Sequence, residues 1–176
     1  LTTAYSFYFQ IKPSVDARAY DNIAQNLVAG NGFREDAMAD VTHDTAMLRA
    51  GPGYEFFLAG IFFTFGYSYA IVWTLQALLH ALTVYLIYLI CLKIFPEDGK
   101  KIGFIAGTLF AFWPDLIEIS AMLMTETLYL FFTALIVYLF VRAYEKPQSV
   151  QLALLLGVAT ALGILTPPPL LLFAPI

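Results

Sequence analysis

A run of 37 residues without Asp, Glu, Lys or Arg, residues 56–92, constrains the fold of this chain more than any other feature. As one helix the run would be about 55 Å long, whereas the hydrocarbon core of a bilayer is about 30 Å thick. The run must therefore break, and "FGYS" at residues 65–68 is the natural place. The first piece, residues 52–66, is then short for a membrane span, whereas residues 69–95 are long enough.

The composition places the chain in the membrane class. Hydrophobic residues make up 60% of it and charged residues 12%, with a mean hydropathy of +0.75, against roughly 45–50% and about 25% in soluble domains. The net charge of -4 implies no basic face for nucleic acid, and the single Cys91 excludes a disulfide framework. The chain begins at Leu1 and ends inside an apolar stretch, so we expect a fragment of a longer membrane protein.

We expect an all-α fold: a polytopic membrane helix bundle with a long external loop that carries surface helices. The polar stretches "PEDGKK" and "RAYEKPQS" and the triple proline at residues 167–169 divide the apolar segments. Residues 1–176 are interpreted as one transmembrane domain. Its parts are an external loop at 12–50, an interfacial helix at 52–66, and spans at about 69–95, 102–117, 119–141 and 150–166.

Charge predicts the orientation. The short loops at 93–101 and 142–149 hold five of the nine basic residues, and two spans separate them, so the positive-inside rule places both in the cytoplasm. Residues 115–126 are acidic and then lie outside. If residues 52–66 span the membrane, the 12–50 region is cytoplasmic; if they lie in the outer interface, it is external. Their length favours the interfacial alternative.

Residues 16–29 are predicted to form an amphipathic helix in the 12–50 loop. Ser14 or Asp16 can cap its start, and Gly30 can end it. One face is apolar at helical spacing and consists of Tyr20, Ile23, Ala24, Leu27 and Val28.

Two carboxylates are candidate functional groups. For Asp16 the alternative is a plain helix cap, which contributes about 1 kcal/mol. Glu126 lies in "AMLMTETLYLFF", and an acid in such an apolar segment is a functional hypothesis by default; its alternative is a side chain that only reaches the headgroups. Common metal-protease, nucleotide-binding and serine-hydrolase motifs are absent, and His80 is interpreted as a packing residue.

Two further motifs stand at helix ends. In "RAGPGYEFFLAG", residues 49–60, Pro and Gly precede an aromatic helix; the plain interpretation is a loop-to-helix junction. In "LGILTPPPLLL", residues 162–172, three prolines break a membrane helix, which is tolerated where the freed backbone lines a cavity or meets other protein. The plain interpretation here is the end of a span.

The order of motifs carries a family resemblance. An Asp precedes "YxxxAxNLxxGxGF", and then come a Pro-aromatic helix ending in "FG", the span "LQALLHALTVYLIYLI", a Pro-bearing turn, "TE" with an apolar span, and "ALGILTPP". This series resembles the N-terminal part of the membrane glycosyltransferases of the GT-C class. It is most similar to the branch with the protein O-mannosyltransferases and the aminoarabinose lipid A transferase.

The resemblance implies a function. Such enzymes move a sugar from a polyprenyl-phosphate donor to a lipid, glycan or protein acceptor at the outer face, here of the plasma (inner) membrane, with inversion expected. Asp16 occupies the place of the catalytic Asp, as general base, and Glu126 that of a second acid. If the reaction uses a divalent cation, these two acids are its expected ligands. The expected substrate-binding residues are Arg49, Tyr54, Tyr20 and Arg34, with Arg49 on the lipid phosphate.

One departure from the family pattern matters. Many relatives carry "TRP" after the "ALGL" run, but Pro167 follows Thr166 here, so the phosphate contact must come from elsewhere. Two other classes stay open at this point: a transporter or channel-like subunit with Glu126 in an ion path, and a structural assembly subunit. The long polar 12–50 loop argues against the transporter.

Overall fold

The computed structural model describes residues 1–11, 13, 15–38, 44, 46 and 51–166. Within these ranges the protein is all helical, which confirms the expected fold class. The helices, in chain order, are α1 (Thr2–Phe9), α2 (Val15–Val28), α3 (Gly53–Phe65), α4 (Tyr69–Ile94), α5 (Gly99–Phe112), α6 (Pro114–Ala121), α7 (Glu126–Glu145) and α8 (Val150–Ile164).

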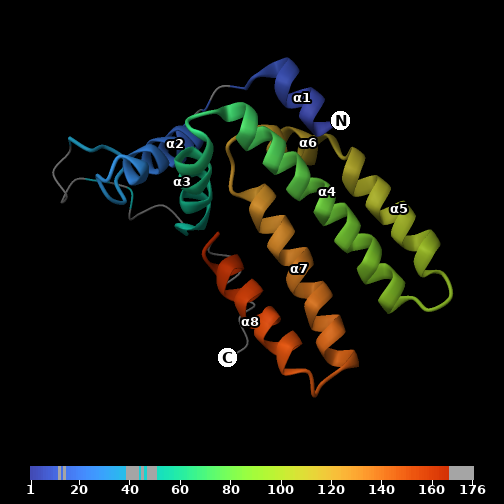
Figure 1. Ribbon diagram of the computed structural model, residues 1–176. Helices are drawn as coiled ribbons and strands as arrows, with labels where there is room; N and C mark the ends of the chain where they lie inside the picture. The colour runs from blue at the N-terminus through green and yellow to red at the C-terminus, as the bar shows by residue number, and fades with distance from the viewer. Residues whose placement is uncertain (12, 14, 39–43, 45, 47–50, 167–176) are drawn as a thin grey trace.

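The long helices form a bundle in which α4 packs against α5, which runs antiparallel to it, and against α7, which runs in the same direction, while α8 packs antiparallel against α7 (Figure 1). The short helices α1, α2, α3 and α6 gather at the end where α4 and α7 begin, which we call the upper end. The turns after α4 and after α7 lie together at the lower end, where Lys93 Nζ is 2.9 Å from a Glu145 carboxylate oxygen. Both side chains are more than a third exposed, so this pair contributes at most about 1 kcal/mol.

Two helices, α4 and α7, are long and apolar enough to cross a membrane by length and composition. The pair α5 and α6 passes the same test only if taken together, and it is bent by 55°. Helices α3 and α8 are apolar but shorter, at 13 and 15 residues, or about 20 and 22 Å at 1.5 Å per residue. The assignment of α3 to the interface stays a prediction, and α3 packs mainly against α2.

The helix bounds differ from expectation between residues 102 and 141. The segment expected as one span over 102–117 divides at Trp113, whose backbone is extended at φ −68° and ψ 120°. Proline disfavours the helical conformation in the residue before it, so Pro114 ends α5 and starts α6. The segment expected over 119–141 is not one helix either, because α6 ends at Ala121 and α7 begins at Glu126.

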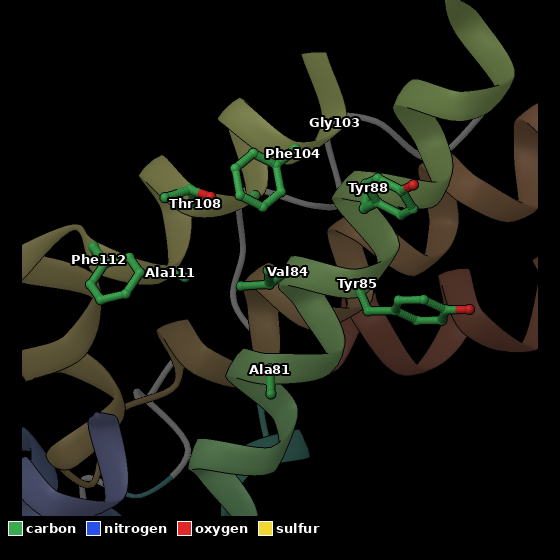
Figure 2. Close-up of a pocket in the computed structure, with 10 residues that line it drawn as sticks. Ala81, Val84, Tyr85, Tyr88, Gly103, Phe104, Thr108, Ala111 and Phe112 are labelled. Atoms are coloured by element: carbon green, nitrogen blue, oxygen red, sulfur yellow. The ribbon is translucent and has the colours of Figure 1, made fainter. Parts of the chain in front are cut away.

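Helix α5 approaches α4 along a stripe of buried glycines, Gly99, Gly103 and Gly107. A Cβ atom on Gly99 would lie 2.7 Å from the Cys91 carbonyl oxygen, and one on Gly103 would lie 2.9 Å from the Tyr88 ring. Such small-residue stripes let membrane helices pack closely. Beside the stripe, α4 and α5 line a groove of about 310 Å³ (Figure 2).

Helix α2 follows the sequence prediction within one residue at each end. Ile23 and Ala24 of the predicted face are buried, Tyr20 and Leu27 are half-buried, and Val28 is exposed. Gly30, at φ +81°, ends the helix with the expected left-handed conformation. The amide of Gly30 bonds the Leu27 carbonyl and that of Asn31 bonds the Asn26 carbonyl, which is the Schellman pattern.

Candidate active site

Tyr54, in the first turn of α3, is the centre of the upper end. It is fully buried, and its hydroxyl donates to Gln76 Oε1 of α4 at 2.6 Å. Burial first, and then the charge of Glu126, raise the pKa of Tyr54 well above its ordinary value, so it stays a neutral donor. Tyr54 was expected to bind substrate; in this structure its hydroxyl is engaged within the protein.

Gln76 joins three elements through one amide. Its oxygen accepts from Tyr54, and its nitrogen donates to the carbonyls of Ser120 at 2.9 Å and Met122 at 2.7 Å. These carbonyls lie at the end of α6, where helix bonding stops. A primary amide has two N–H donors, so both are used and the buried side chain is satisfied. This network fixes the α6–α7 turn, and hence the start of α7, against α3.

Glu126 is the first residue of α7 and is half-buried. Its Oε2 accepts from the Thr125 hydroxyl at 3.3 Å. A carboxylate in the first turn of a helix is favoured by the macrodipole and by unpaired amide N–H groups. Its place at the start of a helix agrees with the acid that opens a span in the family resemblance, but not with the predicted span over 119–141, in which it would lie inside the helix.

Asp16 lies in the first turn of α2 with its side chain exposed, while the next residue, Ala17, is buried. The residue that precedes the helix, Ser14, lies outside the described residues, so the choice between the two caps stays open.

The elements that carry the two carboxylates meet in one apolar cluster around Tyr54. Ala17 of α2 belongs to it, and so do Leu123, ahead of Glu126, and Leu128, two residues after it. Tyr20 of α2 packs its ring against Tyr54 with centroids 5.6 Å apart. The pairing of Asp16 with Glu126 as one site stays a prediction, which this arrangement supports.

An apolar groove of about 400 Å³ opens beside this cluster, between α3, α7 and α8. Leu128 and Phe132 of α7 line one wall, and Leu162 of α8 with Leu165, the residue after α8, line another. Its volume falls within the range of about 300–1,000 Å³ that is usual for small-molecule sites. Because Leu128 lies two residues after Glu126, the groove begins next to the polar turn.

The two motifs at helix ends contact each other. The Gly53 amide donates to the Leu165 carbonyl at 2.6 Å, and a Cβ atom on Gly51 would clash with the Thr166 carbonyl oxygen. Gly51 also has φ +76°, which favours glycine. The end of α8 thus packs against another part of the chain, as tolerated helix breaks do, and Gly53, Leu165 and Thr166 of this junction line the groove.

The two arginines expected to bind substrate, Arg49 and Arg34, differ in what the structure shows of them. Arg49 lies outside the described residues. Arg34 faces its own loop: its guanidinium contacts the Ala37 carbonyl at 3.5 Å. The amide of Ala46, then those of Glu35 and Asp36 and the charge of Arg34, lower the pKa of Asp44 against the opposing effect of burial.

Sequence reasoning missed two polar residues of the upper end, Gln76 and Asp21. Gln76 is a lone amide in the uncharged run, which was the available signal. Asp21 falls on the buried face of α2 with Ala17 and Ala24, at spacings of four and three residues, and an acid on an apolar face was likewise a signal. His80 is buried in α4 and stacks on Phe110 at 5.3 Å, in keeping with a packing role.

The described part of the chain contains no group of three or more His, Cys, Asp or Glu side chains that could hold a metal ion. Asp16 and Glu126 therefore belong to no such group there, and no step below is assigned to a metal.

Comparison with known proteins gave one match. A family model described as dolichyl-phosphate-mannose-protein mannosyltransferase matches residues 49–176, which is 128 of the 176 residues. A search of curated proteins and a search of solved structures each found no match. The matched region contains α3 to α8, with Glu126 and the groove, and begins after α2.

Proposed function

Because the chain belongs to the dolichyl-phosphate-mannose-protein mannosyltransferase family, a family of membrane glycosyltransferases of the GT-C class, we propose that it transfers a sugar from a polyprenyl-phosphate donor to an acceptor outside the membrane. Asp16 is the general base, and the upper end of the bundle is the reaction site. The sugar is mannose or a related hexose, and the acceptor is a lipid, glycan or protein.

One observation carries this proposal: a polar turn and an apolar groove lie side by side at the same end of the bundle. The groove starts at Leu128, next to Glu126, and is lined almost entirely by apolar side chains of α3, α7 and α8. A polyprenyl-phosphate sugar has the same division, with a long apolar chain joined to a charged head. The groove suits the chain, and the acidic rim suits a sugar and its acceptor.

The chemistry requires little from the protein beyond position and a base. The acceptor hydroxyl or amine attacks the anomeric carbon, and its proton passes to the Asp16 carboxylate. The bond from the anomeric carbon to the phosphate oxygen breaks, and polyprenyl phosphate leaves as an anion. A single displacement of this kind inverts the configuration at the anomeric carbon.

The other residues have supporting roles. Glu126 orients the acceptor by accepting a hydrogen bond from it, and Arg49 stabilises the leaving phosphate by its charge. Tyr20, beside Tyr54 on α2, and Arg34, in the loop after α2, are proposed to contact the substrate. A divalent cation, if one binds, would be held by Asp16 and Glu126 and would add charge stabilisation for the phosphate.

The upper end is proposed to face away from the cytoplasm. Five of the nine basic residues lie at or beside the two lower turns, in residues 93–101 and 142–149. Cytoplasmic loops carry an excess of Lys and Arg. The plasma (inner) membrane is the proposed location.

The direct test uses the complete protein as its gene encodes it, purified and reconstituted in liposomes. Polyprenyl-phosphate mannose carrying a radiolabel in the sugar is the donor, and membranes of the source cell supply acceptors. We expect label to move into the acceptor fraction and Glu126→Gln to lower the rate. Absence of transfer together with ion flux through the same liposomes would contradict the proposal and favour a transporter.

A further inference from the structure

Asp21 is a buried carboxylate on α2 that the proposed chemistry does not use. Its side chain is only 5% exposed. Its Oδ2 accepts from the hydroxyls of Tyr67 and Tyr69, each at 2.8 Å, and from Gln25 Nε2 at 3.1 Å, whereas Oδ1 is buried without a partner. Burying an acid costs free energy that an apolar residue would not. Packing alone therefore does not account for an Asp at this position.

The two tyrosines lie on a different part of the chain from Asp21. Tyr67 belongs to the link between α3 and α4, and Tyr69 is the first residue of α4. Burial raises the pKa of Tyr67 above its ordinary value, so it remains a neutral donor. The bonds to Asp21 join α2 to the link and to α4, a helix long enough to span the membrane. Hydrogen bonds to a charged acceptor are about twice as strong as those between neutral groups.

The number of hydroxyl hydrogens limits how Asp21, Tyr67 and Tyr69 can bond to one another. The three oxygens of Asp21, Tyr67 and Tyr69 are mutually within hydrogen-bond distance, but two phenols supply only two hydrogens. Each hydrogen must point either at the carboxylate or at the other phenol, so few arrangements satisfy the group. We call Asp21, Tyr67 and Tyr69 the α2 clasp.

The clasp is the second fixed point on α2. The first is the apolar cluster around Tyr54, to which Ala17 belongs and in which the Tyr20 ring packs against Tyr54. An apolar contact by itself fixes the orientation of a helix less strictly than a hydrogen bond does, because the hydrophobic effect has no direction. A directional bond at Asp21 removes that freedom, and the first turn of α2, which carries Asp16, then has one orientation relative to α3 and α4.

We propose that Asp21 is a positioning residue, which acts through the α2 clasp to hold Asp16 at the reaction site. The proposal rests on the proposed function, in which Asp16 is the base. Misplacing a reacting group by about 1 Å can cost on the order of 10²-fold in rate. Loss of the clasp should therefore lower the rate of transfer while the protein stays folded.

The first experiment measures geometry and needs no activity. Spin labels are placed at Val15→Cys, 79% exposed beside Asp16, and at Leu78→Cys, 54% exposed on α4, in a Cys91→Ala background. Pulsed electron resonance then gives the distance distribution. We expect a narrow distribution that broadens or shifts when Tyr67→Phe and Tyr69→Phe are combined, since phenylalanine keeps the ring packing. An unchanged distribution would overturn the proposal.

The second experiment separates positioning from packing. Asp21→Leu removes the buried acid and keeps a side chain that branches at Cγ, so a packing role predicts unchanged transfer by the folded protein. We expect the melting temperature to hold and kcat to fall roughly tenfold or more, with the KM for polyprenyl-phosphate mannose unchanged. Asp21→Asn, which keeps an acceptor oxygen, should recover part of the rate. Tyr144→Phe, 83% exposed at the lower end, is the control.

A double-mutant cycle with Asp16→Asn distinguishes this inference from the proposed function. If Asp21 acts through Asp16, then Asp21→Leu lowers kcat in the parent and has no further effect in the Asp16→Asn background. Equal falls in both backgrounds, or parental transfer by a folded Asp21→Leu protein, would overturn the positioning role alone. Parental transfer by Asp16→Asn would overturn the proposed base and the positioning role with it.

Discussion

At the residue scale, the upper end depends on a few buried polar side chains that each serve two elements. Gln76 accepts a hydrogen bond from Tyr54 and uses both of its N–H donors on two backbone carbonyls at the end of α6. A buried network of this kind is costly when one member is removed, because the remaining groups lose their partners without regaining water. Tyr54 therefore supports the site through Gln76 and the start of α7.

Tyr54→Phe tests this network. The ring packing remains, but Gln76 Oε1 is left buried without its donor, so we expect a loss of about 1–3 kcal/mol in stability. Thermal unfolding in detergent measures it, and Tyr144→Phe, on an exposed tyrosine, is the matched control. An unfolding midpoint equal to that of the parent would show that Gln76 finds another partner.

At the element scale, local patterns were enough to predict α2, its glycine stop and the break between α3 and α4. Each of these depends on residues close together in the sequence, such as Gly30 or Gly66 at positive φ. The contact between Gly53 and Leu165, and that between Asp21 and Tyr67, join residues far apart in the chain. Such contacts depend on tertiary packing, which periodicity and turn chemistry do not contain.

The bend between α5 and α6 has a local cause in the sequence, yet the predicted spans do not include it. The sequence contains its cause, because Pro114 disfavours a helical Trp113. The predicted span over 102–117 nevertheless contains Pro114, because the apolar character of the segment continues on both sides of the proline. The pair "TE" likewise indicates a helix start at Glu126, yet the predicted span begins at residue 119.

The α4–α5 contact gives a prediction at this scale. Gly99→Ala places a methyl group 2.7 Å from the Cys91 carbonyl oxygen and 2.9 Å from the Leu92 Cα, and these backbone atoms cannot move cheaply. We expect α5 to shift and the protein to lose about 1–3 kcal/mol. Gly157→Ala is the matched control, since a Cβ atom there meets nothing within 4 Å. Equal melting temperatures for the two variants would contradict the close approach.

At the scale of the whole molecule, the bundle has a polar, multi-helix upper end and a simple lower end with two basic turns. This asymmetry is what a membrane enzyme with its reaction on one side requires. The resemblance to the GT-C class is confirmed by the family match over residues 49–176, whereas the side of the membrane and the donor are proposals.

Cysteine labelling tests the orientation. In a Cys91→Ala background of the complete protein, an impermeant maleimide applied to intact cells should label Val15→Cys at the upper end. Gln148→Cys, in the lower turn after α7, should react only after the cells are opened. The reverse pattern would place the upper end in the cytoplasm and contradict the proposed topology.

The most direct test of the central claim is the rate of sugar transfer by Asp16→Asn. Asn caps a helix about as well as Asp, so a capping role predicts the parental rate. A general base predicts a loss of roughly 10²-fold or more in transfer from polyprenyl-phosphate mannose, with folding and membrane insertion intact. The complete protein must be used, and Asp36→Asn, on an exposed part of the following loop, controls for the loss of one charge. Transfer by Asp16→Asn at the parental rate would contradict the account.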